Sequence, residues 1–115
     1  RYLSALQFMD GVIGNSSSGL IEAPTFKVGT INIGDRQRGR IKADSVIDCE
    51  PIKLDIKRAL ATLYSSPFQN KLMDIDNPYG SGGVAQRIVP LLSRPSLHGL
   101  LKKSFYNINQ MQSQE

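Results

Sequence analysis

Hydrophobic residues along this chain alternate between short runs typical of buried strands and spaced positions typical of amphipathic helices. The short runs predict three strands, at residues 12–13, 30–34 and 45–49. The spaced positions predict helices over residues 1–9, from Leu20 to about Phe26, from Pro51 to Pro67, over a turn or two within 68–73, over 84–92 shortened or kinked by Pro90, and over 97–108. Strands and helices in alternation predict a parallel sheet covered on both faces. We therefore expect a three-layer α/β unit with a short parallel sheet and flanking helices.

The length of 115 residues allows one small core. We expect residues 1–108 to form one partial domain and residues 109–115, a polar stretch, to form a disordered tail. The chain opens at Arg1, inside a helix-like pattern and without a methionine, so we expect it to be part of a longer protein.

Charge and composition narrow the classes of partner. The net charge of +4 is mild and no basic block is interleaved with aromatic residues, which does not favour nucleic-acid binding. The apolar runs are too short to span a membrane. The single cysteine, Cys49, lies in an apolar run, where a structural thiol is expected rather than a nucleophile, and it fits a reducing, cytoplasmic setting. The single histidine, His98, has no partner at metal-ligand spacing, so we expect no metal site.

The stretch from Gly14 to Pro24 places two glycines and three consecutive serines at a predicted strand-to-helix turn. Glycines let the backbone bend and let a ligand approach closely. Serines such as Ser16 and Ser17 cap helices, and the free amides of a first turn bind anions, most often phosphate. Glu22 would repel phosphate, but it is suited to accept hydrogen bonds from the hydroxyls of a ribose. Helix capping alone and nucleotide binding both fit this stretch.

A basic loop, residues 35–42, follows the second predicted strand directly. Its cations alternate along the chain, so an extended backbone would place all of them on one side: Arg36, Arg38, Arg40 and Lys42. A solvated loop without a partner is one interpretation. The other is a diphosphate site, because open α/β sheets bind ligands at the carboxyl ends of their strands and one arginine can hold a phosphate through two hydrogen bonds. Arg36, nearest the strand, has the best reach.

These two stretches, together with Asn77-Pro78-Tyr79-Gly80, closely resemble the C-terminal part of UDP-N-acetylglucosamine 2-epimerases. The run Asn32-Ile-Gly-Asp-Arg-Gln-Arg-Gly-Arg40 looks like the hydrolysing branch, which makes precursors of sialic-acid-type sugars. The similarity covers roughly residues 1–95. It implies the C-terminal domain of a GT-B-like two-domain fold, as in one large class of glycosyltransferases, with the active site between two Rossmann-like domains.

The resemblance also implies roles for particular residues. Ser16 and Ser17 match the serines that hold the phosphates, Glu22 matches the acid that binds the uridine ribose, and Arg36 matches an arginine lining the nucleotide site. Asn15, Gly19, Arg38 and Arg40 belong to the same motifs without a separate role. The family's Tyr-Gly-Asp-Gly is Tyr79-Gly80-Ser81-Gly82 here, so the missing aspartate leaves that loop without an assigned role.

In the family, UDP is eliminated from a sugar deprotonated at C2, and water then adds to the glycal and releases a free 2-epimeric sugar. We find no match in this chain to the family's catalytic acid and base residues, so no catalytic residue and no cofactor are assigned. We expect a UDP-binding part that, without its N-terminal domain, binds UDP weakly at best and is inactive. We also expect it to pair with a second copy through the exposed edge of strand 12–13. A nucleotide-sugar glycosyltransferase and a non-catalytic nucleotide-binding module are the alternatives.

Overall fold

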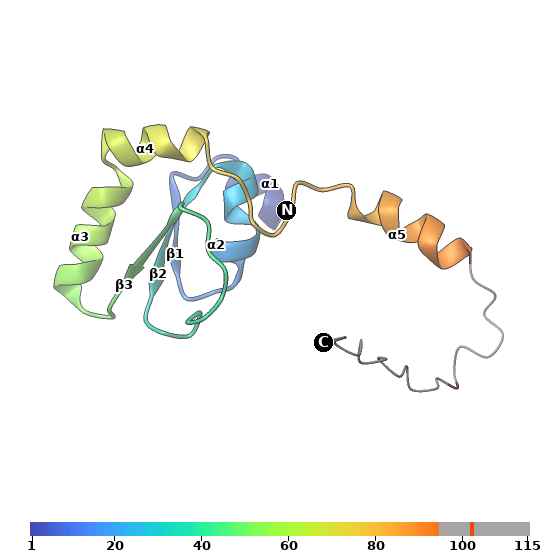
Figure 1. Ribbon diagram of the computed structural model, residues 1–115. Helices are drawn as coiled ribbons and strands as arrows, with labels where there is room; N and C mark the ends of the chain where they lie inside the picture. The colour runs from blue at the N-terminus through green and yellow to red at the C-terminus, as the bar shows by residue number, and fades with distance from the viewer. Residues whose placement is uncertain (95–101, 103–115) are drawn as a thin grey trace, which may run out of the picture. The chain divides into compact units, whose positions relative to one another are not determined.

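The computed structural model describes residues 1–94 and residue 102 (Figure 1). Its elements are α1 (Tyr2–Leu6), β1 (Gly11–Gly14), α2 (Ser18–Ile21), the 3-10 helix η1 (Ala23–Phe26), β2 (Gly29–Ile33), β3 (Val46–Cys49), α3 (Lys53–Leu63), α4 (Ser66–Met73) and α5 (Val84–Ser93). The chain divides into a first compact unit, Arg1–Gly82, and a second that begins at Gly83. The predicted helix over 97–108, the predicted tail and the boundary at 108 lie outside the described residues.

The three strands form one parallel sheet in the order β1-β2-β3. Val12 pairs with Thr30, and Ile31 pairs with Ile47. Parallel neighbours require a crossover between strands, and α2 with η1 supplies the one from β1 to β2. The sheet confirms the predicted α/β class, and the carboxyl ends of all three strands meet at one edge.

Helices cover the sheet on both faces, which confirms the three layers (Figure 1). On one face the core is Ile31, Ala59 and Leu63, with Phe68 of α4 packed against it. On the other face Thr30 donates its hydroxyl hydrogen to the Gly19 carbonyl of α2 at 2.8 Å. Successive residues of β2 therefore anchor opposite layers, as the pleat of a strand requires.

Two glycines allow these layers to approach closely. A Cβ atom added at Gly29 would lie 2.4 Å from Leu63 Cδ1 and 2.8 Å from Phe68 Cε1. A Cβ atom added at Gly19 would lie 2.4 Å from the methyl carbon of Thr30. All three distances are far below van der Waals contact, so the helices pack where a side chain would otherwise hold them away from the sheet.

The predicted helix boundaries at three prolines need correction. Pro51 precedes α3 instead of opening it, because Ile52 is still extended and the helix begins at Lys53. Pro67 lies in the first turn of α4, where its missing N–H costs no hydrogen bond, and α3 has already ended at Leu63. Pro90 does not shorten α5, which continues past it to Ser93.

Candidate functional site

The Ser-rich turn follows β1 and the basic loop follows β2, so the two stretches emerge at the same edge of the sheet. Side chains of the basic loop contact the turn directly at Asn15. Gln37 donates from Nε2 to the Asn15 main-chain carbonyl at 2.7 Å, and Arg36 donates from Nη1 to the Asn15 side-chain oxygen at 3.3 Å. The structure thus confirms that the two motifs lie together, in the position where open parallel sheets bind ligands.

Within the Ser-rich turn, α2 begins at Ser18, two residues before the predicted start. Ser17 is the N-cap residue, yet its side chain makes no capping hydrogen bond. Ser16 Oγ accepts from the Ser18 amide at 3.4 Å, and the Ser18 hydroxyl bonds to that of Tyr2 in α1. The hydroxyl of Ser17 is therefore not used to cap the helix, which weakens the interpretation of this stretch as capping alone.

Glu22 lies between α2 and η1 and is half-buried. Its Oε2 atom is buried and has no hydrogen-bond partner within residues 1–94 and 102. A buried carboxylate oxygen normally accepts at least one hydrogen bond, so this atom leaves an acceptor available for a donor from outside the described residues.

The basic loop is compact, and its cations do not share one side. The amide of Arg38 donates to the Asp35 carbonyl at 2.8 Å and that of Arg40 donates to the Gln37 carbonyl at 3.3 Å. Gly39 adopts φ 77°, which turns the chain back. The extended backbone that would align all four cations is therefore wrong, and Arg36 alone among them bonds to the Ser-rich turn.

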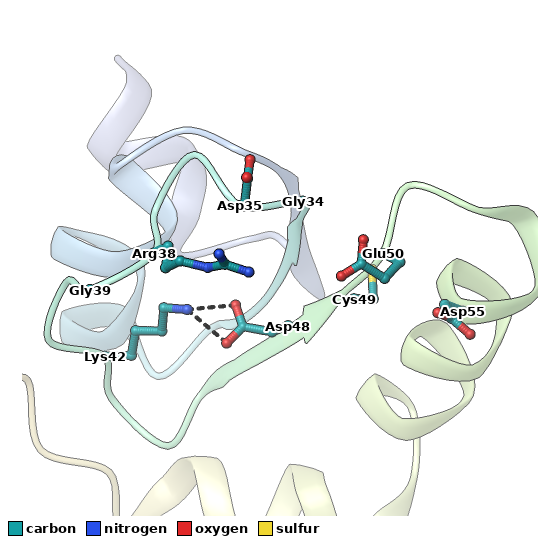
Figure 2. Close-up of a pocket in the computed structure, with 9 residues that line it drawn as sticks. All are labelled: Gly34, Asp35, Arg38, Gly39, Lys42, Asp48, Cys49, Glu50 and Asp55. Carbon is teal, nitrogen blue, oxygen red and sulfur yellow. Dashed lines mark hydrogen bonds and ion pairs between the residues drawn. The ribbon is translucent and has the colours of Figure 1, made fainter.

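Beside β3 the same loop lines a cavity of about 410 Å³ (Figure 2). Figure 2 shows Arg38 and Lys42 extending from the loop in the direction of Asp48. Lys42 Nζ bonds to both Asp48 oxygens at 2.7 Å, and Asn32 donates to Oδ1 at 2.7 Å. Burial raises the pKa of Asp48, but these hydrogen bonds and the Lys42 charge outweigh it and hold the pKa below its usual value. Asp48 is consequently ionised at neutral pH and unsuited to act as a general acid.

Cys49 is half-buried at the end of β3 and packs against the Ile31 cluster. Burial raises the pKa of its thiol, and the nearby carboxylates of Asp55, Asp48 and Glu50 raise it further. Because a nucleophilic cysteine needs a lowered pKa, the thiol of Cys49 is a packing group, as its apolar sequence context predicts.

The Asn77-Pro78-Tyr79-Gly80 loop is held against α2 and η1. Asn77 Nδ2 donates to the Ile21 carbonyl at 2.8 Å and to the Thr25 hydroxyl at 2.7 Å. The Tyr79 hydroxyl donates to the Ile41 carbonyl at 2.8 Å, so this loop also contacts the end of the basic loop. The sequence leaves the role of Tyr79 open, and the structure shows a loop anchor.

Two residues of the site escape sequence reasoning. Asn15 receives no role from its motif, yet it joins the two loops, and Gln37 is not singled out among the arginines around it. For Gln37, the signal in the sequence is an uncharged amide side chain between two arginines, Arg36 and Arg38.

Within residues 1–94 and 102 there is no group of three or more His, Cys, Asp or Glu side chains placed to hold a metal ion. No helix in this part of the chain is both long and apolar enough to cross a membrane. His98 lies outside the described residues.

Comparison with known proteins agrees with this geometry. The model of the family described as UDP-N-acetylglucosamine 2-epimerase matches residues 1–93, which include the Ser-rich turn, the basic loop and the Asn77 loop. The chain belongs to the UDP-N-acetylglucosamine 2-epimerase family.

Three curated relatives illustrate the branch of the family. The chain is 47% identical over 78 residues, 68% of its length, to the polysialic acid biosynthesis protein P7 of Escherichia coli. It is 39% identical over 109 residues, 94% of its length, to a GDP/UDP-N,N'-diacetylbacillosamine 2-epimerase (hydrolyzing) of Campylobacter jejuni. It is 34% identical over 98 residues, 85% of its length, to a UDP-N,N'-diacetylbacillosamine 2-epimerase (hydrolyzing) of Legionella pneumophila. The matches span 20%, 28% and 25% of those proteins, so the chain corresponds to a minor part of an epimerase.

Proposed function

We propose that this chain is the UDP-binding C-terminal portion of a hydrolysing UDP-N-acetylglucosamine 2-epimerase. The observation that carries the proposal is the joining of the Ser-rich turn to the basic loop through Asn15, at the carboxyl edge of a parallel sheet. Membership of the family supports a nucleotide sugar as the ligand that we propose for this edge.

In this proposal, different residues bind the phosphates and the ribose of the nucleotide. Ser16 and Ser17 bind the phosphates with their hydroxyls, and Arg36 adds a cation that reaches the same turn. Glu22 accepts a ribose hydroxyl on the Oε2 atom that lacks a partner within the described residues. The hydroxyl of Ser17, which caps no helix, and the buried acceptor of Glu22 support this division.

The reaction we propose for the whole enzyme is hydrolytic. A base removes the C2 proton of the sugar, the C1–oxygen bond breaks, and UDP leaves with the bonding electrons. Water then adds to the glycal, its oxygen to C1 and a proton to C2 from the opposite face, which frees the 2-epimeric sugar. In this proposal, this chain binds UDP, the leaving group, and the proton-transfer residues belong to the rest of the enzyme. We therefore propose that the chain alone is inactive.

The relatives bear on which sugar is used. Two of them are named for N,N'-diacetylbacillosamine, a diacetamido sugar, and the third for polysialic acid biosynthesis. We propose UDP-N-acetylglucosamine or a related UDP-diacetamido sugar as the substrate. We also propose a cytoplasmic location, because the single cysteine, Cys49, cannot form an intrachain disulfide, which fits a reducing setting.

Strand β1 lies at an edge of the sheet, and we propose one partner for this edge in the whole enzyme and another in the isolated chain. β1 pairs only with β2 in the described sheet, and the Ile13 side chain on it is 54% exposed. An unpaired edge strand is a template for pairing. We propose that the N-terminal part of the enzyme covers this edge in the whole protein, and that two copies of the isolated chain pair through it. Sedimentation of the isolated chain tests the dimer, since a monomer whose β1 amides resist hydrogen exchange would contradict it.

Product analysis of the whole enzyme tests the reaction. Incubation with the UDP-sugar in H₂¹⁸O and D₂O should release UDP and a free 2-epimer that carries ¹⁸O at C1 and deuterium at C2. The isolated chain under the same conditions should release no UDP. A 2-epimer that stays attached to UDP would show an epimerase without hydrolysis. A product that forms only with an acceptor would show a glycosyltransferase.

A further inference from the structure

Gln37 is a buried amide in the middle of an exposed, charged loop. Its side chain is 3% exposed, whereas both neighbours, Arg36 and Arg38, are exposed. Burying a primary amide removes four hydrogen bonds to water, and Oε1 of Gln37 finds no replacement within residues 1–94 and 102. An apolar side chain would fill this site at a lower cost of desolvation, so burial by itself does not explain the amide.

The contacts of Gln37 lead to the Ser-rich turn. Nε2 donates to the Asn15 carbonyl at 2.7 Å, immediately before Ser16. The main-chain carbonyl of Gln37 accepts from the Arg40 amide at 3.3 Å, which closes the loop behind it. One residue thus holds both the shape of the basic loop and its position against the turn.

Arg36, the next residue back along the chain, depends on that position. Its guanidinium is exposed and reaches Asn15 through a single hydrogen bond of 3.3 Å, which is long and weak. The bond from Gln37 is shorter, at 2.7 Å, and partly buried, so it is the stronger of the two connections. Gln37 therefore makes the shorter of the two contacts that hold the loop carrying Arg36 against Asn15, the residue before Ser16.

We infer that Gln37 is a positioning residue for diphosphate binding, acting through Asn15 and Arg36 without touching the ligand. The inference rests on the proposed function, since it assumes that the joined loops hold UDP. Because Gln37 holds Arg36 in place before binding, Arg36 loses less conformational entropy when the phosphates bind, and the affinity for the phosphates is higher. Gln37 does not change the affinity for the base or the ribose.

Nuclear magnetic resonance titration of the chain with UDP and with uridine tests the inference. Gln37→Met keeps the side-chain length and removes the donor. We expect its Kd for UDP to rise about tenfold, equivalent to about 1.4 kcal/mol, while its Kd for uridine is unchanged. Ile41→Ala, in the same loop and 66% exposed at the native side chain, is the matched control and should bind both ligands as the unaltered chain does.

A double-mutant cycle separates positioning from general stability. Arg36→Gln should weaken UDP binding less in the Gln37→Met background than in the unaltered chain, because the guanidinium is already misplaced there. If Gln37→Met does not fold, Gln37→Leu replaces it, since this apolar side chain also lacks the donor to the Asn15 carbonyl and adds no charge beside the phosphates.

The outcomes distinguish the inference from the proposed function. UDP binding unchanged by the substitution, equal losses for UDP and uridine, or additive effects of Arg36 and Gln37 would each overturn the positioning role while leaving UDP binding intact. An unaltered chain that binds neither ligand would overturn the proposed function, and the positioning role with it.

Discussion

Asn77 donates its side-chain amide to the main-chain carbonyl of Ile21 at 2.8 Å, across 56 residues of sequence. The same Nδ2 reaches the Thr25 hydroxyl at 2.7 Å, and Oδ1 accepts from the Tyr79 amide at 2.9 Å. Ile21 is the last residue of α2, where helix carbonyls lack partners inside the helix. Asn77 therefore supports the element that carries Glu22 from a distant loop.

Replacing Asn77 by alanine should destabilise the chain by about 1–3 kcal/mol, because the partly buried Ile21 carbonyl loses its donor. Urea denaturation measures the loss. Asn70→Ala, at an exposed position of α4, is the control and should change stability by less than about 0.5 kcal/mol. Equal effects of the two substitutions would show that the Asn77 contacts do not stabilise α2.

Glu22→Gln should weaken UDP binding through the ribose. The substitution preserves shape but replaces one carboxylate oxygen by a donor, and Oε2 is the acceptor left without a partner in the described structure. We expect about a tenfold loss of affinity for UDP and no loss for 2',3'-dideoxy-UDP, which has no ribose hydroxyl to donate. The two ligands can be compared by titration. Equal losses for both would place Glu22 away from the ribose.

The ion pair between Lys42 and Asp48 should make stability depend on pH. The pKa of Asp48 is lower in the folded chain than in the unfolded chain, so folding releases protons at pH values between the two pKa values. The stabilisation is therefore complete above the unfolded pKa, near 4, and is lost as the pH falls through the folded value. Asp48→Asn should destabilise the chain at pH 7, and the difference from the unaltered chain should shrink steadily below about pH 4.

Asp44→Asn provides the control for that experiment. Asp44 pairs with Lys71 at 2.8 Å, and both side chains are exposed, at 72% and 52%. Asp48 is 55% exposed, but its partner Lys42 is 24% exposed and Asn32 donates to it as well, so the Asp44 substitution should have the smaller effect at any pH. Urea midpoints for the three proteins between pH 2 and 7 give the comparison. A loss from Asp48→Asn that stays constant over this range would contradict the role of its ionisation.

Gly29→Ala tests the close approach of α3 to the sheet. The added methyl would lie 2.4 Å from Leu63 Cδ1, and Leu63 is 3% exposed in the core, so the helix or its side chains must shift. We expect a loss of about 1–3 kcal/mol in thermal or urea unfolding. The added loss should be smaller in a Leu63→Ala background, which vacates the space. Equal losses in both backgrounds would place the strain elsewhere.

The pattern of residues predicts most of the fold and half of the site. Runs such as Val12–Ile13 and Thr30–Ile33 identify the strands because β-branched residues favour an extended backbone and turn residues bound each run. Helix ends were less accurate at Pro51 and Pro67, since proline suits a first turn as well as a stop. The meeting of the two loops at one edge follows from the topology of a parallel sheet alone.

The fold class, the strands and the stretches that meet at the carboxyl edge can be predicted from the order of residues, because these features depend on local periodicity and on chain direction. Only the folded chain shows that Gln37 is buried, that Asn15 joins the loops, and that Arg38 and Lys42 extend toward Asp48 (Figure 2). These features depend on hydrogen bonds between residues up to 22 positions apart and on a loop folded back at Gly39, neither of which leaves a periodic trace in the chain.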